Sequence, residues 1–105
     1  MRVVKLVGVL PSSKVADVLG RQLLRSATSV GANYRSAQRA RSTAEFISKL
    51  GIAEEEADES AYWLDLLAES EIVPRHGLEP LLRESSEITA MIVASIRTAR
   101  KKSPR

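Results

Sequence analysis

The chain has 105 residues and a mass of 11.5 kDa, which predicts a single domain with one modest core. It contains no cysteine, so disulfides, thiolate metal ligands and cysteine nucleophiles are excluded. A single histidine and an aromatic content of 4% argue against acid–base catalysis and against a stacking platform for single-stranded bases. Because no apolar run reaches the length of a membrane span and no signal peptide opens the chain, we expect a soluble cytoplasmic protein.

The formal net charge of +3 hides a segregation of charge along the chain. Residues 1–49 carry a net charge of +7, residues 50–87 carry −9, and residues 88–105 carry +5. Such asymmetry is typical of a basic surface that binds nucleic acid. It is equally typical of acidic and basic helices that pair inside one fold or between subunits, so both interpretations stay open.

The first predicted element is a helix over residues 2–10, where Val3, Leu6, Val7 and Leu10 recur at helical spacing. The pattern starts at once, without a capping residue ahead of it. We therefore expect the chain to be a slightly shortened version of a longer unit, with an in-frame continuation upstream.

The second helix is predicted over residues 14–40, with Ser13 as its N-cap. Gly20 is expected to break off a short first turn or two of this helix, since glycine costs about 1 kcal/mol in a helix interior. The third helix is predicted over residues 43–72, because Ser42-Thr43-Ala44-Glu45 is a capping box in which each side chain accepts from the other residue's backbone N–H. Its predicted core stripe is Phe46, Leu50, Ala53, Ala57, Ser60, Leu64 and Leu67.

The fourth helix is predicted over residues 78–102, after a loop at residues 74–77 and with Pro80 in its first turn. Four helical segments joined by short loops predict an all-α, antiparallel up-down-up-down four-helix bundle in a single domain. The first helix would span only about 13 Å, against roughly 35–45 Å for the others. One groove of the bundle is therefore expected to be partly filled, and to be covered by another subunit or by upstream chain.

Several polar and small residues fall on faces that are predicted to be buried. Asn33 shares a helical face with core positions, so we place it near a core layer where its amide needs partners. Ala27 and Gly31 lie four residues apart, a spacing that allows close approach of another helix. Trp63 lies off the main stripe of the third helix and indicates a second packing surface.

The run Glu54-Glu55-Glu56-Ala57-Asp58-Glu59 places five carboxylates in six positions. Like charges three or four residues apart destabilise a helix, so basic side chains are expected beside this run, with Arg25, Arg35 and Arg39 as candidates. A carboxylate metal site is the alternative. We do not predict one, because Glu56-x-x-Glu59 lacks the histidine of the di-iron bundles.

A series of short motifs resembles one known family: QLLRSATSVGANY over residues 22–34, Ser42 with Glu45-Phe46, Glu56-Ala-Asp-Glu59, and Tyr62-Trp63-Leu64. These motifs are similar to the four-helix-bundle proteins of the 23S rRNA intervening-sequence type, also called S23-like proteins. The resemblance implies a bundle that assembles as a ring-shaped homopentamer and has no established enzymatic activity. It also implies that the motif residues are structural: Gln22, Arg25, Ser26, Ser29, Asn33, Ser42, Phe46, Glu56, Glu59 and Trp63.

The family resemblance bears on partners as well. A related branch, the accessory proteins of diversity-generating retroelements, binds nucleic acid and a reverse transcriptase. Members of the family usually carry a longer first helix than residues 2–10 provide.

We expect a non-enzymatic oligomer without metal, cofactor or small-molecule substrate, because the sequence offers no nucleophile–base pair, phosphate loop or metal ligand set. RNA or DNA is the expected partner, bound through basic surfaces of the second and fourth helices. The alternative is a purely structural or protein-binding oligomer with no nucleic-acid contact. The candidate nucleic-acid-binding residues are Arg35, Arg39, Arg41, Arg97, Arg100, Lys101 and Lys102.

Overall fold

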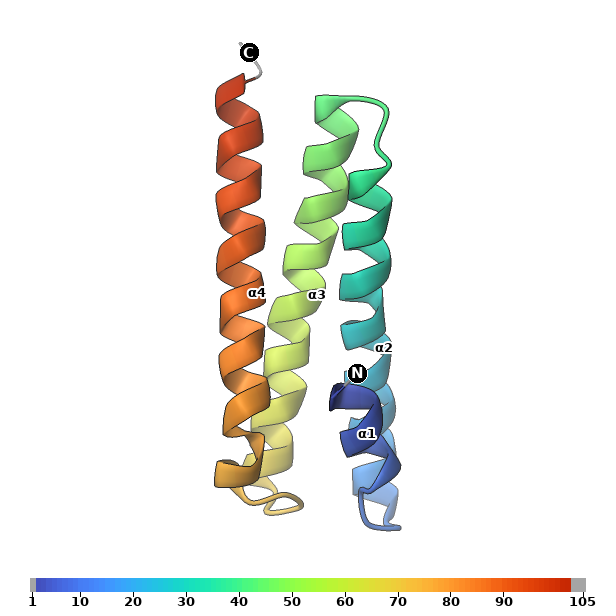
Figure 1. Ribbon diagram of the computed structural model, residues 1–105. Coiled ribbons are helices and arrows are strands. Elements are labelled where there is room, and N and C mark those ends of the chain that lie inside the picture. The colour runs from blue at the N-terminus through green and yellow to red at the C-terminus, as the bar shows by residue number, and fades with distance from the viewer. Residues whose placement is uncertain (1, 103–105) are drawn as a thin grey trace.

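The computed structural model describes residues 2–102 and has four α-helices in this range (Figure 1). They are α1 (Arg2–Gly8), α2 (Lys14–Gln38), α3 (Thr43–Glu69) and α4 (Arg75–Lys102). Successive helices run in opposite directions, and no strand occurs within residues 2–102. The predicted all-α, up-down-up-down bundle is therefore confirmed.

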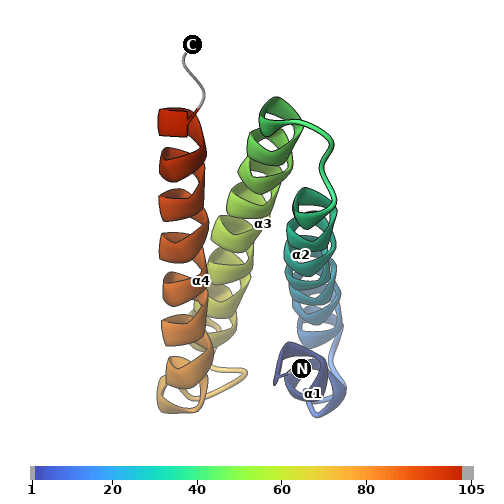
Figure 2. The same ribbon diagram turned by 45° about the horizontal axis from the view of Figure 1, so that its top comes forward.

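The helices differ greatly in length, and this shapes the molecule. α3 packs along α2 on one side and along α4 on the other, giving a body that measures 51 × 21 × 18 Å. α1 has only 7 residues and lies against the first turns of α2, so it covers only the lower part of the bundle (Figures 1 and 2). Above α1 the bundle is a three-helix arrangement.

Two helices end slightly earlier than predicted because their last turns tighten. After α1 ends at Gly8, the Leu10 N–H donates to the Val7 carbonyl at 3.4 Å. After α2 ends at Gln38, the Ala40 N–H donates to the Ala37 carbonyl at 3.0 Å. These hydrogen bonds join residues three apart, as in a 3₁₀ turn, and they close the helix ends. Both helices therefore stop two residues short of the predicted positions.

α3 ends at Glu69 instead of the predicted residue 72, in a Schellman motif. The Ile72 N–H donates to the Leu67 carbonyl at 3.1 Å, and the Glu71 N–H donates to the Ala68 carbonyl at 3.0 Å. Glu71 has a φ of 59°, the left-handed conformation that usually requires glycine. Because the sequence lacks glycine here, the motif was not predictable from composition.

α4 begins at Arg75, three residues before the predicted start, and Pro80 is therefore its sixth residue and not part of the first turn. Proline at this position removes one intrahelical bond, the one to the carbonyl of His76. His76 is exposed, so water can satisfy that carbonyl. The additional turn carries Leu78, which is fully buried in the core.

The predicted N-caps of α2 and α3 are confirmed. Ser13 Oγ accepts from the Ala16 N–H, and Ser42 Oγ accepts from the Glu45 N–H, both at 3.1 Å. The predicted reciprocal hydrogen bond of the capping box is wrong. The Glu45 carboxylate accepts from the backbone N–H of Arg41 at 3.4 Å and not from that of Ser42.

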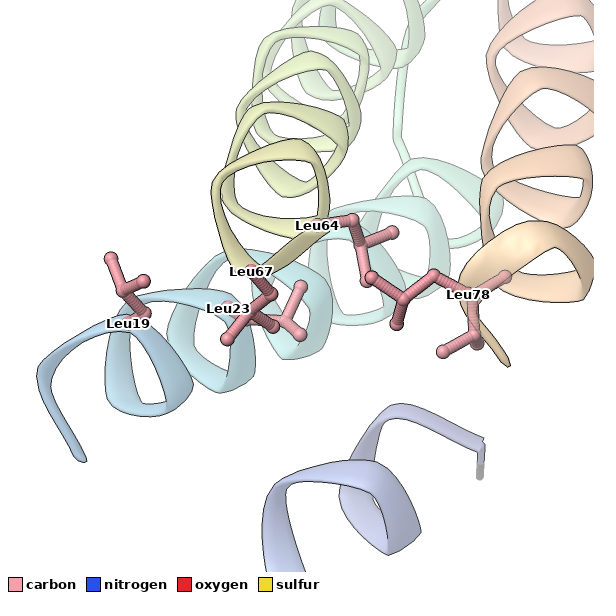
Figure 3. Packing of buried hydrophobic residues seen from close by; sticks show 6 residues of the cluster. Leu19, Leu23, Leu64, Leu67 and Leu78 are labelled. Atoms are coloured by element: carbon pink, nitrogen blue, oxygen red, sulfur yellow. The ribbon is translucent and has the colours of Figure 1, made fainter. Parts of the chain in front are cut away.

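The core consists of two hydrophobic clusters. The lower cluster is built from leucines of α2, α3 and α4, and Figure 3 shows Leu23, Leu64, Leu67 and Leu78 pointing toward one another above α1. The upper cluster contains Ala37, Leu50, Ala53, Ile92 and Ile96. Six of the seven predicted stripe positions of α3 are buried, and only Phe46 is half-buried.

Two serine hydroxyls lie between the clusters. Ser26 Oγ and Ser60 Oγ are 2.9 Å apart. The Leu23 carbonyl lies 3.2 Å from Ser26 Oγ, and the Glu56 carbonyl lies 2.9 Å from Ser60 Oγ. Each buried hydroxyl therefore has a partner, as burial requires.

Side chains of α1 and of the residue just after the following turn pack on α2 at Gly20. α2 is continuous through this residue, so the expectation that Gly20 breaks off the first turns of the helix is wrong. A Cβ atom at residue 20 would lie 2.9 Å from Leu10 Cδ1 and 3.5 Å from Val7 Cγ1. The missing side chain is what allows the end of α1 to pack on α2.

Candidate functional site

The seven candidate nucleic-acid-binding residues all lie at one end of the bundle, which we call the basic end. Because α2 and α4 run in the same direction, their C-terminal turns lie together with the loop between α2 and α3 (Figure 1). The seven side chains are all exposed. The basic end comprises Arg35 and Arg39 of or next to α2, Arg41 of the loop, and Arg97, Arg100, Lys101 and Lys102 of α4.

The positive charge of the basic end is not neutralised by its own segments. Residues 35–49 and 97–102 carry eight Lys or Arg and one carboxylate, Glu45, for a net charge of +7. Within residues 2–102, none of the seven side chains forms an ion pair with a carboxylate. Their charges are therefore available to an anionic partner.

A shallow hollow between α3 and α4 lies at the same end. Its walls include Gly51 and Glu54 of α3 and Arg97 and Arg100 of α4, with Val93 among the apolar residues below. A Cβ atom at Gly51 would meet nothing within 4 Å, so the hollow is open at this point. Gly51 was not among the predicted site residues, although a glycine inside a strongly helical segment is a signal for such an opening.

Arg25 is the centre of a second polar arrangement, on the outer seam between α2 and α3. Its Nη1 lies 3.2 Å from Glu56 Oε2, and its Nη2 contacts Glu59 Oε1. Its Nε donates to Gln22 Oε1 at 3.2 Å, and the Trp63 Nε1–H donates to Glu59 Oε1, also at 3.2 Å. One guanidinium therefore links the two helices, and Glu59, one of its two carboxylate partners, also accepts from the indole of Trp63.

The expectation of basic side chains beside the acidic run is confirmed for Arg25 and wrong for Arg35 and Arg39. The close pair of Ser26 and Ser60 fixes the register of the antiparallel helices. With a rise of about 1.5 Å per residue, Arg35 and Arg39 lie roughly 4 and 10 Å beyond Glu54, the nearest member of the run, and neither forms an ion pair with it among the described residues. They belong to the basic end instead.

The motif residues Ser29, Asn33 and Phe46 form contacts within their own chain. Ser29 accepts from the Asn33 amide at 3.0 Å through its carbonyl and at 3.2 Å through its hydroxyl. Asn33 is half-buried, and its amide finds the partners it was expected to need within its own helix. Phe46 packs half-buried against the upper cluster.

Ala27 and Gly31 do not bring two helices of this chain together. Ala27 is half-buried, while Gly31 is exposed and a Cβ atom there would meet nothing within 4 Å. The indole of Trp63 packs half-buried against the lower cluster of its own chain and edge-on against Tyr62.

Among residues 2–102, no three His, Asp or Glu side chains are gathered as metal ligands. None of the helices in this range combines the length and apolar character that a membrane span requires.

These features define a class of protein, a small all-α antiparallel bundle with a short first helix and a cationic end. The chain matches the 23S rRNA-intervening sequence protein family over residues 1–94, and it belongs to that family. A solved structure from Bacteroides thetaiotaomicron, of a protein of unknown function from the S23 ribosomal protein family, is 42% identical. The two superpose with a TM-score of 0.85, over 90% of this chain and 88% of the other. No curated protein matches the chain.

Proposed function

We propose that this protein is a non-enzymatic oligomeric bundle that binds the phosphate backbone of RNA or DNA through its basic end. The observation that supports this proposal is the set of seven exposed cations on two helix ends and one loop. Within residues 2–102, none of these seven side chains forms an ion pair. Exposed Lys and Arg bind phosphates without reading sequence, and the binding is driven by counterion release.

A ring, such as the expected pentamer, would strengthen this binding. Each basic end alone offers only a few phosphate contacts. Several copies held in one assembly present these contacts to the same nucleic acid, so the second and later contacts form at high effective concentration. The molar mass of the protein by light scattering tests the oligomeric part of the proposal separately.

The competing function is a structural or protein-binding oligomer that touches no nucleic acid. It is favoured by the pairing of the acidic run with Arg25, which shows that part of the charge segregation serves the fold. That pairing leaves the basic end untouched, and for this reason we prefer the nucleic-acid interpretation.

The test is a titration of labelled RNA and duplex DNA with the protein across a salt series, read by fluorescence anisotropy. The variant Arg97→Gln, Arg100→Gln, Lys101→Gln removes three charges from the basic end. The matched control Lys5→Gln, Lys14→Gln, Arg83→Gln removes three exposed charges elsewhere. For duplex DNA we expect the slope of log K against log salt to flatten by up to about 0.9 for each lost contact in the first variant only. Absence of binding at low salt, or equal effects of both variants, would refute the proposal.

A further inference from the structure

The hollow between α3 and α4 at the basic end combines an apolar floor with charged walls. Its volume is about 280 Å³, close to the lower limit of about 300 Å³ for small-molecule sites in proteins. The apolar side chains that line it are Ile47, Val93 and Ile96, and the charged ones are Glu54, Arg97 and Arg100. The hollow therefore has room for one small planar group with charges around it.

This hollow lies on the side of α4 that faces away from α1. α1 meets α4 at Glu84, whose carboxylate oxygen lies 3.9 Å from Nε of Arg2. Val93 follows Glu84 by about two and a half helical turns, so the two side chains project from opposite sides of α4. Gly51 keeps the hollow open, because a Cβ atom there would meet nothing within 4 Å. The opening is therefore a property of the packed pair of α3 and α4.

The charges of the hollow are separated along the bundle. Because α3 and α4 are antiparallel, Glu54 is level with Val93 at one end of the hollow, and Arg100 is level with Ile47 at the other. At a rise of about 1.5 Å per residue, these two ends are about 10 Å apart. In the described part of the chain, Glu54, Arg97 and Arg100 form no ion pair. The carboxylate and the two guanidinium groups therefore face one opening without pairing directly.

This arrangement suits a ligand with a flat body, an anionic group at one end and a hydrogen-bond donor at the other. A nucleotide with an amino-bearing base has these three parts. Arginine binds phosphate through its planar fork of N–H donors, and a glutamate carboxylate accepts from the N4 amino group of cytosine. In a duplex that base is stacked and its amino group is paired, so only an unpaired base can be turned into the hollow.

We infer that the hollow binds one unpaired, amino-bearing base of a single-stranded nucleic acid. The base lies over Gly51 and Val93, its amino group donates to the Glu54 carboxylate, and the adjoining phosphates contact Arg97 and Arg100. This inference rests on the proposed binding of nucleic acid by the basic end, and it adds a preference for single strands and for one kind of base. Holding a single base requires no series of aromatic side chains.

The probes are labelled oligocytidine and oligouridine of equal length, compared with duplex DNA by fluorescence anisotropy at low salt. The two oligomers differ at position 4 of the base, where cytosine carries the amino group and uracil carries a carbonyl. Glu54→Gln keeps the size of the side chain and removes its charge.

A second variant, Gly51→Leu, fills the hollow. Gly31→Leu is its matched control on α2, because a Cβ atom would meet nothing within 4 Å at either glycine. Leucine has a higher helix propensity than glycine, so both variants are expected to stay folded, as thermal melting would verify.

We expect the natural chain to bind oligocytidine about tenfold more tightly than oligouridine, because a hydrogen bond to a carboxylate is charge-assisted. In E54Q this ratio should fall below about twofold. G51L should weaken the binding of oligocytidine at least about fivefold and change that of duplex DNA less than about twofold, whereas G31L should change both less than about twofold.

Equal binding of the two oligomers to the natural chain would overturn the inference, as would equal effects of G51L and G31L. The same conclusion follows if E54Q tightens binding of both oligomers equally, because Glu54 then only lowers the positive charge of the basic end. In each of these cases, duplex binding that persists leaves the proposed function standing. Absence of binding of every probe at low salt would refute both proposals.

Discussion

The bridge from Arg25 to Glu56 and Glu59 makes a measurable prediction about stability. Arg25→Met keeps the long apolar stem but removes both charge contacts. A partly exposed ion pair contributes about 0.2–1 kcal/mol, and two of them act here on side chains that are 49%, 17% and 36% exposed. Removing the guanidinium also leaves two like charges three residues apart, which costs a further ~0.2–0.5 kcal/mol.

These terms together predict that R25M lowers the free energy of unfolding by about 1–2 kcal/mol. For a domain of this size each kcal/mol corresponds to roughly 4–8 °C in the melting temperature. Urea unfolding followed by tryptophan fluorescence measures the loss directly, because Trp63 is the single tryptophan and its indole donates to Glu59. Its emission should change in the folded variant as well.

Arg21→Met is the matched control for this measurement. Arg21 lies on the same helix and pairs with Asp17 at 3.0 Å, but both side chains are more than half exposed, at 78% and 60%. Loss of this ion pair should lower the free energy of unfolding by only about 0.3–0.5 kcal/mol. A double-mutant cycle of R25M with Glu59→Gln then isolates the coupling between the two side chains. The reasoning is refuted if R25M costs no more than R21M, or if that coupling is zero.

Two further predictions concern the backbone at glycine and non-glycine positions. Glu71→Gly should raise the free energy of unfolding by up to ~1 kcal/mol, because residue 71 has a φ of 59° that glycine adopts without strain; urea unfolding that shows a loss would contradict this. Gly20→Leu should loosen α1, since its Cβ alone would lie 2.9 Å from Leu10 Cδ1 and 3.5 Å from Val7 Cγ1, and the rest of the leucine side chain would have to displace both residues. Hydrogen exchange should then be faster in residues 2–10 and unchanged in α4, and uniform protection in both segments would count against a steric effect.

The sequence predicts the long helices well because their burial follows a simple period. The stripe from Leu50 to Leu67 alternates steps of three and four residues, and each of its members is buried. The end of α3 was not predictable in the same way, because Glu71 adopts a conformation that its residue type rarely takes. The start of α4 was predicted three residues too late, because Pro80 was assigned to the first turn of the helix. The helix begins at Arg75 instead, and the additional turn carries the buried Leu78.

The polar residues show a different limit of sequence reasoning. Which basic residue reaches the acidic run depends on the register of two antiparallel helices, and the sequence does not contain that register in a local pattern. The Ser26–Ser60 contact fixes it, so Arg25 meets the run and Arg35 does not. Asn33 was predicted to need hydrogen-bond partners, and its own helix supplies them in Ser29.

The serine layer between the two clusters has a consequence for cooperativity. The leucine cluster below it includes contacts from α1, whereas the upper cluster is formed by α2, α3 and α4 alone. The two serines provide less apolar contact between the lower and upper clusters than leucines would. The two halves of the bundle are therefore coupled mainly through the continuous helices. We therefore expect two subglobal unfolding units, in which detachment of α1 opens the leucine half while the upper half keeps its protection.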